Sequence, residues 1–104
     1  MKSYSFSFSQ RVKLLRYLFD LSARAQLREN FYQVREQSGY FSNNNLTDIL
    51  EKAVDFLDED SRRIIVNDFK LKAEKHWWQS FYSRSTYYRL KSKATAELIN
   101  CLHG

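Results

Sequence analysis

The sequence predicts an all-α protein, a small helical domain of about five helices, because it repeats the helical period and lacks the signals of β structure. Proline is absent and glycine occurs only at positions 39 and 104, so the turn residues of β-hairpins are missing. Apolar residues recur at intervals of three and four along most of the 104 residues. Only Tyr4, Phe6 and Phe8 alternate with polar residues, which favours a short extended arm laid on the core.

The first helix is predicted from about Gln10 to Ser38. Ser9 is a suitable N-cap and Gly39 a suitable terminator. The pattern leaves open whether this is one helix or two helices bent near Ser22. Its inner positions are Val12, Leu15, Leu18, Phe19, Ala25, Phe31, Tyr32 and Val34.

A second helix follows a loop rich in asparagine and serine at residues 40–45. Asn45 or Thr47 would cap it, and Asp48 and Glu51 would lie favourably near the positive end of its dipole. One face is acidic. The other face is an apolar stripe of Leu46, Ile49, Leu50, Ala53, Val54 and Leu57.

A third helix is predicted to begin at residues 58–60, where three acidic residues mark a break in the pattern. Ile64, Ile65 and Phe69 point inward, and residues 72–74 form a joint. The outer side of this helix carries Arg62, Arg63 and Lys70.

Two further helices complete the prediction. Residues 74–81 suit a short helix that carries Trp77 and Trp78, and Ser83 is well placed to cap a last helix that runs to about Cys101. The inner stripe of the last helix is Tyr87, Leu90, Ala94 and Leu98.

Charge is distributed unevenly about a net charge of +5. Residues 1–44 carry seven Lys/Arg and three Asp/Glu, residues 45–60 carry one and six, and residues 61–104 carry nine and three. Two basic parts separated by an acidic belt indicate an anionic partner.

Residues 58–101 follow the order helix, short helix, tight turn and helix, which is the order of a helix-turn-helix. A recognition helix enters the major groove by its N-terminal part, so the residues after its cap must be polar and lie opposite an apolar stripe. The stretch 83–94 meets this requirement. Its outward positions are Arg84, Ser85, Tyr88, Arg89 and Ser92. We therefore divide the chain into a helical scaffold at residues 1–57 and a helix-turn-helix region at residues 58–104, together one compact unit.

The stretch Tyr82-Ser83-Arg84-Ser85-Thr86-Tyr87-Tyr88-Arg89 resembles ArpU-type phage transcriptional regulators and, more distantly, the helix-turn-helix of sigma-factor region four. The resemblance covers about residues 60–98, under half of the chain. It implies a DNA-binding transcription factor, one that also touches RNA polymerase. It also implies that Ser83 caps the recognition helix, that Tyr87 and Leu90 are buried, and that Arg84, Ser85, Tyr88 and Arg89 face DNA.

The predicted DNA-binding residues are Lys75, Ser83, Arg84, Ser85, Thr86, Tyr88, Arg89, Ser92 and Lys93. Arg84 and Arg89 each suit a bidentate contact to guanine, although a phosphate contact or a surface ion pair would use the same side chains. A solvated basic face on a packing helix is the simpler alternative for the whole stretch. The phosphate contacts would come from Arg62, Arg63, Lys70, Lys72, Lys75, Lys91 and Lys93.

Six aromatic residues crowd into positions 77–88, and at least four of them are expected in the core. Trp78 and Tyr88 are the expected exceptions, and they open the alternative of stacking on single-stranded DNA or RNA.

Nothing in the sequence predicts an enzyme or a cofactor. No nucleophile, base and orienting residue form a set, and no glycine-rich phosphate loop is present. His76, His103 and Cys101 lack metal-ligand spacing, and Cys101 is expected to be a small buried residue. A single cysteine and the absence of a signal peptide or membrane span favour the cytoplasm.

The sequence thus predicts a DNA-binding transcriptional regulator that reads double-stranded DNA, with a homodimer among the arrangements that would read two half-sites. The alternative is a helical protein-interaction module, for instance an accessory factor that docks on RNA polymerase through its acidic second helix.

Overall fold

The computed structural model describes residues 6–36 and 45–103, and every regular element in these ranges is helical. The predicted all-α class is therefore confirmed. The elements are α1 (Phe8–Glu36), α2 (Asn45–Asp55), α3 (Glu59–Ile65), the π-helical turn η1 (Val66–Lys70), the 3₁₀ turn η2 (Trp77–Ser80) and α4 (Arg84–His103).

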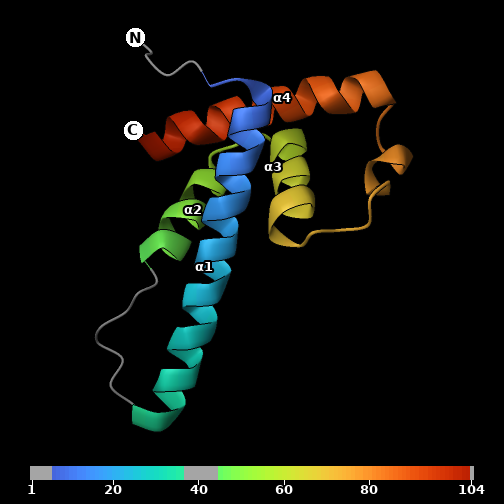
Figure 1. Ribbon diagram of the computed structural model, residues 1–104. Coiled ribbons are helices and arrows are strands. Elements are labelled where there is room, and N and C mark those ends of the chain that lie inside the picture. The colour runs from blue at the N-terminus through green and yellow to red at the C-terminus, as the bar shows by residue number, and fades with distance from the viewer. Residues whose placement is uncertain (1–5, 37–44, 104) are drawn as a thin grey trace.

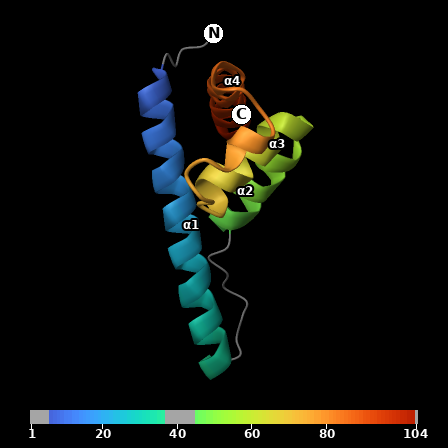
Figure 2. The same cartoon turned by 90° about the vertical axis from the view of Figure 1, so that its right-hand side faces the viewer.

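Three of the helices meet α4 (Figure 1). α1 crosses α4 near its own amino end and then runs past the rest of the molecule, so that its carboxyl end projects away from the other helices (Figure 2). α3 stands beneath α4, and η2 lies beside the amino end of α4. No helix among the described residues is both long enough and apolar enough to cross a membrane.

The amino end of α1 differs from the prediction by two residues. Ser7 is the cap, because its hydroxyl accepts from the Gln10 amide at 3.1 Å while the Gln10 side chain accepts from the Ser7 amide at 2.9 Å. Ser9 cannot form the same reciprocal pair, because Val12, three residues after it, has no side-chain acceptor. Phe8 accordingly begins a helix instead of ending an extended arm. α1 continues unbroken past Ser22, whereas the predicted helix end at residues 38–39 and the loop at 40–44 lie outside the described residues.

The short helix predicted at residues 74–81, the fourth of the five, is reduced to the single 3₁₀ turn η2. The chain leaves η1 through Lys72, whose φ of 53° ends the helix, and residues 71–76 connect it to the side of α4. Because residues 71–76 form this connection, η2 has only four residues. Helices this short usually have 3₁₀ geometry.

The core draws on all four α-helices. Phe19 of α1 stacks on Phe69 of η1, with ring centroids 6.1 Å apart. Ser22 of α1 and Thr47 of α2 share a buried hydrogen bond of 2.6 Å, so Thr47 connects two helices and does not cap one. The main cluster consists of Leu15, Phe19, Leu50, Ala53, Val54, Leu57, Ile65, Phe69, Ala94, Leu98 and Ile99.

Three residues predicted to be inside are exposed: Ile49, Phe81, which is 54% exposed, and Cys101. Ile49 is 50% exposed because α2 packs through Leu50 and Val54 instead. Cys101 is also exposed. The inner stripe of α4 continues from Leu98 to the half-buried Leu102, four residues further on, so position 101 falls beside that stripe.

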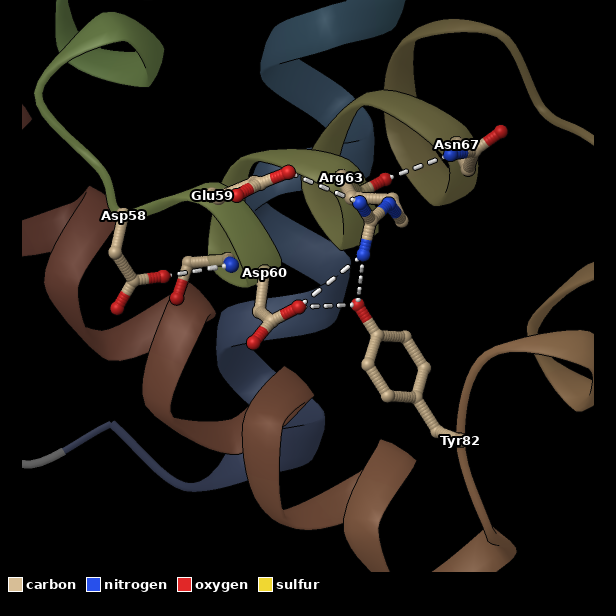
Figure 3. Close-up of polar contacts among 7 residues, drawn as sticks. Asp58, Glu59, Asp60, Arg63, Asn67 and Tyr82 are labelled. Atoms are coloured by element: carbon tan, nitrogen blue, oxygen red, sulfur yellow. Dashed lines mark hydrogen bonds and ion pairs between the residues drawn. The ribbon is translucent and has the colours of Figure 1, made fainter.

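α3 begins where the three acidic residues predict it. Asp58 is the N-cap, and one of its carboxylate oxygens accepts from the Ser61 amide at 2.8 Å (Figure 3). The other oxygen accepts from Lys93 of α4 at 2.7 Å. The pKa of Asp58 is lowered to about 2, mainly by the hydrogen bond from Lys93 and next by the hydrogen bond from the Ser61 amide. One carboxylate thus caps α3 and ties it to α4.

Replacing Asp58 by alanine is expected to lower the free energy of unfolding at neutral pH by about 1 kcal/mol, the usual contribution of an N-cap. The pKa of Asp58 lies below its ordinary 3.8 in the folded protein. Its contribution is therefore complete above that value and is lost as the pH falls toward about 2. Urea unfolding at a series of pH values should show the two proteins converging in this interval. Asp55→Ala is the control, and a constant difference between parent and Asp58→Ala would contradict the expectation.

Candidate nucleic-acid interface

The amino half of α4 is the part that the sequence singles out as a recognition helix. Ser83 caps it as predicted, because its hydroxyl accepts from the Thr86 amide at 3.2 Å. Tyr87, Ala94 and Leu98 face inward and are buried, which confirms three positions of the predicted stripe, while Leu90 is half-buried. The side of α4 opposite this stripe therefore faces away from the core.

Four predicted DNA-contacting residues lie on that opposite side: Arg84, Ser85, Tyr88 and Arg89. All four are exposed, and Tyr88 is 45% exposed. We call these four residues the α4 outer face. In Figure 1 this part of α4 extends beyond the crossing with α1. The first turn of α4 contains no acidic residue, so the positive end of the helix dipole is not compensated there.

The two arginines of the α4 outer face form no ion pair with any side chain that the structure describes. Among the side chains that the structure describes, at residues 6–27 and 46–103, no carboxylate lies within 4.0 Å of the guanidinium of Arg84 or Arg89. Lys75 is likewise exposed and without an ion pair in the described ranges, but it lies in the connection between η1 and η2 and not on α4. Both arginines thus keep their donors for an external acceptor.

The remaining residues of the predicted site make contacts inside the protein. Ser92 is half-buried, and its hydroxyl accepts from Arg11 of α1 at 2.8 Å. Lys93 donates to Asp58 at 2.7 Å and lies 3.8 Å from Glu97. Thr86 is half-buried and accepts from the Ser83 hydroxyl at 3.0 Å.

A buried carboxylate that the sequence analysis missed fixes the orientation of α4. Asp68 of η1 accepts hydrogen bonds from the indole of Trp77 at 2.8 Å and from the hydroxyl of Tyr87, and it forms an ion pair with Lys91 at 3.1 Å. The side chains of Asp68 and Lys91 are only 13% and 11% exposed. Burial first, and then the bond to Asp68, raise the pKa of the Tyr87 hydroxyl, so this group remains a donor.

The prediction that Lys91 contacts phosphate is therefore wrong. Its ammonium group lies near the rings of Phe69 and Tyr87, at 5.6 and 5.5 Å from their centroids, and donates to the Tyr87 hydroxyl at 3.2 Å. A signal for this pair exists in the sequence. Asp68 follows Ile64 by four residues and Lys91 follows Tyr87 by four, so both charges lie on the inner stripes of two neighbouring helices.

Trp78 and Tyr87 form a second small core with Ile64 beside α4. Trp78 is 8% exposed and stacks on Tyr87 with centroids 4.6 Å apart, so its predicted exposure is wrong. Tyr88 meets the Trp78 and Tyr87 rings edge-on at 6.4 and 4.8 Å. The ring of Tyr88 is therefore positioned by the protein although it is partly exposed.

The turn that leads into α4 is attached to α3 by a polar network (Figure 3). Arg63 donates to the hydroxyl of Tyr82 at 2.9 Å and to Asp60 at 3.2 Å, and the Tyr82 hydroxyl donates to Asp60 at 2.8 Å. The Arg63 guanidinium also lies over the ring of Phe81, 4.6 Å from its centroid. Arg63 is thus occupied by the turn and by neighbouring carboxylates.

The described residues contain no group of three or more His, Cys, Asp and Glu side chains that could hold a metal ion. Comparison with protein-family models, with curated proteins and with solved structures gives no match to this chain.

Replacing Asp68 by alanine is expected to lower the free energy of unfolding by about 3 kcal/mol, because the charge of Lys91 would remain nearly buried without a partner. Thermal and urea unfolding measure this effect, with Glu74→Ala as the matched control on an exposed carboxylate. The double variant Asp68→Leu, Lys91→Met should recover part of the loss. A variant Asp68→Ala as stable as the control would contradict this role.

Proposed function

We propose that this chain is a DNA-binding transcriptional regulator that reads double-stranded DNA with a C-terminal helix-turn-helix. In this proposal η2 and the turn at residues 81–83 precede the recognition helix α4, whose amino half enters the major groove. The observation that carries the proposal is the α4 outer face, where Arg84 and Arg89 are exposed without ion pairs in the described structure.

The chemistry of the α4 outer face suits base edges. A guanidinium offers paired donors that match O6 and N7 of guanine, and Arg84 and Arg89 flank Ser85 and Tyr88 along the helix. The Ser85 hydroxyl donates or accepts at any base, whereas the Tyr88 ring provides an apolar surface for a thymine methyl group. Recognition by the first turns of a helix is the normal geometry of this class.

The charge distribution also supports contact with DNA at this place. Lys70, Lys72, Lys91 and Lys93 form ion pairs with Glu51, Asp20, Asp68 and Asp58. Arg63 pairs with Glu59 and Asp60, so that among the described residues from 61 onward the cations without an ion pair are Arg62, Lys75, Arg84 and Arg89. We assign Lys75 to the phosphate backbone and Ser92 and Lys93 to positioning α4 within the protein. A regulator of this kind would act with RNA polymerase, and a homodimer would read two half-sites.

The variants Arg84→Ala and Arg89→Ala are each expected to weaken binding to a duplex selected by the parent protein by about tenfold, a loss within the 1–3 kcal/mol of one bidentate contact. Fluorescence anisotropy at fixed salt measures the dissociation constant. Thermal unfolding should be unchanged, because both side chains are exposed. Lys52→Ala, on the exposed side of α2, is the charge-matched control. If both arginine variants bind as tightly as this control, α4 does not read DNA.

A second candidate function is a protein-interaction module, which one feature favours. A groove of about 470 Å³ lies between α1, α2 and α3. Phe19, Leu50 and Val54 line it with apolar surface, and its charged lining is mixed, with Glu51 and Asp55 beside Arg62 and Lys70. Such a groove suits an apolar segment of a partner protein, including one on RNA polymerase.

Nuclease treatment separates the two functions. A partner bound through the groove should co-purify with the tagged protein after DNA and RNA have been digested, and Ala23→Glu, at an exposed residue that lines the groove, should abolish its retention. Loss of all partners under nuclease would count against the interaction module and in favour of the DNA reader.

A further inference from the structure

Tyr88 belongs to the α4 outer face, yet its ring is held in place by other rings of the protein. It meets Tyr87 edge-on, with centroids 4.8 Å apart and an interplanar angle of 68°, and it meets Trp78 at 6.4 Å and 61°. Edge-to-face pairs at such distances are attractive and orient both rings. The Tyr88 side chain is nevertheless 45% exposed, so part of a positioned ring faces outward.

The two rings that hold Tyr88 are themselves fixed. Trp78 and Tyr87 stack with centroids 4.6 Å apart and an interplanar angle of 8°, and they are only 8% and 4% exposed. The Tyr87 hydroxyl donates to Asp68, which anchors this ring to η1. An aromatic side chain that rests on such a support loses little further freedom when it binds a ligand.

The neighbours of Tyr88 on α4 indicate what its ring would meet. Arg84 precedes Tyr88 by four residues and Ser85 precedes Arg89 by four, so the α4 outer face consists of two adjacent rows. An apolar ring therefore lies between two exposed guanidinium groups. In the major groove, thymine is the base that presents an apolar group, the 5-methyl, and it does so beside hydrogen-bonding groups of the same and neighbouring pairs. 5-Methylcytosine carries this methyl group at the same ring position.

We propose that Tyr88 is a specificity-determining residue that selects a pyrimidine with a 5-methyl group, either thymine or 5-methylcytosine, and that Trp78 is a positioning residue that holds its ring. This inference rests on the proposed function of α4. It adds that one base pair of the DNA site is read through a methyl group and not through hydrogen bonds. Methylation of a cytosine at that pair would strengthen binding, so the modification state of the DNA would regulate the protein.

The test replaces each thymine of the selected duplex in turn by uracil, which removes the methyl group and keeps the hydrogen-bonding groups of the base. At the pair that Tyr88 meets, the full chain is expected to bind the uracil duplex about fourfold more weakly, the loss that corresponds to one buried methyl group. Fluorescence anisotropy measures both dissociation constants. Tyr88→Ala should bind the two duplexes equally, whereas Tyr88→Phe retains the ring and should keep the discrimination. Tyr17→Ala removes an exposed tyrosine of α1 and is the matched control.

A second pair of duplexes separates the two sources of the methyl group. The thymine pair found in this way is replaced by a cytosine pair, with and without the 5-methyl group. The parent protein is expected to bind the methylated duplex about fourfold more tightly, and Tyr88→Ala should show no difference. Equal binding of both cytosine duplexes by the parent protein would overturn the extension to 5-methylcytosine.

A cycle of variants tests the role of Trp78. Trp78→Phe keeps an aromatic residue in the small core but shortens the ring that Tyr88 meets, so it should reduce the discrimination between thymine and uracil. In the Tyr88→Ala background the same substitution should leave the ratio of the two affinities unchanged. A Trp78→Phe variant with a lower melting temperature but the discrimination of the parent would overturn the positioning role.

The outcomes distinguish this inference from the proposed function. Equal effects of uracil on the parent protein and on Tyr88→Ala at every thymine, together with weakened binding by Arg84→Ala, would overturn the role of Tyr88 and leave α4 as the reader. Absence of duplex binding by the parent protein would overturn both.

Discussion

The carboxylate of Asp68 is the contact on which the C-terminal part of the fold depends. It binds an indole, a phenol and an ammonium group that belong to η2 and α4. Without it, Trp77, Tyr87 and Lys91 would lose their shared acceptor in a largely buried site, which is costly in free energy. Such a network specifies one arrangement of η2 against α4, because no other acceptor for all three groups is found among the described residues.

The π-helical turn explains how Asp68 reaches this site. In η1 the Leu71 amide bonds to the carbonyl of Val66, five residues earlier, at 2.8 Å. A π turn holds one residue more than an α turn and so shifts the side chains that follow. Phe69 then packs on Phe19 of α1 in the main cluster, while its neighbour Asp68 faces η2 and α4. π turns are frequent at functional sites, and here the turn divides the apolar core from the buried polar network.

Many cations of this basic chain pair with carboxylates of the same chain, so the unpaired positive charge lies at fewer places on its surface. Several cations near α4 bind carboxylates or the turn before α4, whereas Arg84 and Arg89 keep exposed guanidinium groups. Among the described residues, Arg11 of α1 donates to the hydroxyls of Ser92 and Thr95 on α4. A rigid helix that carries unpaired arginines on one side is suited to an anionic surface with a regular spacing of charge.

Local sequence features determined the elements that depend on neighbours along the chain. The all-α class, the start of α3 at Asp58 and the Ser83 cap of α4 follow from spacing and capping, which act over three or four residues. The exposure of Arg84 and Arg89 follows likewise, since a periodic apolar stripe also defines its opposite side.

Only the tertiary structure decided the contacts between residues far apart in the sequence. Whether a lysine on an inner stripe is solvated or buried depends on the element that packs over it, and Lys91 finds Asp68 across 23 positions. Trp78 is buried for the same reason, because Tyr87 covers it. Ser92 is taken by Arg11 of α1, which no pattern within α4 indicates. Periodicity fixes the side of a helix to which a residue points, but the packing of distant helices fixes what it meets there.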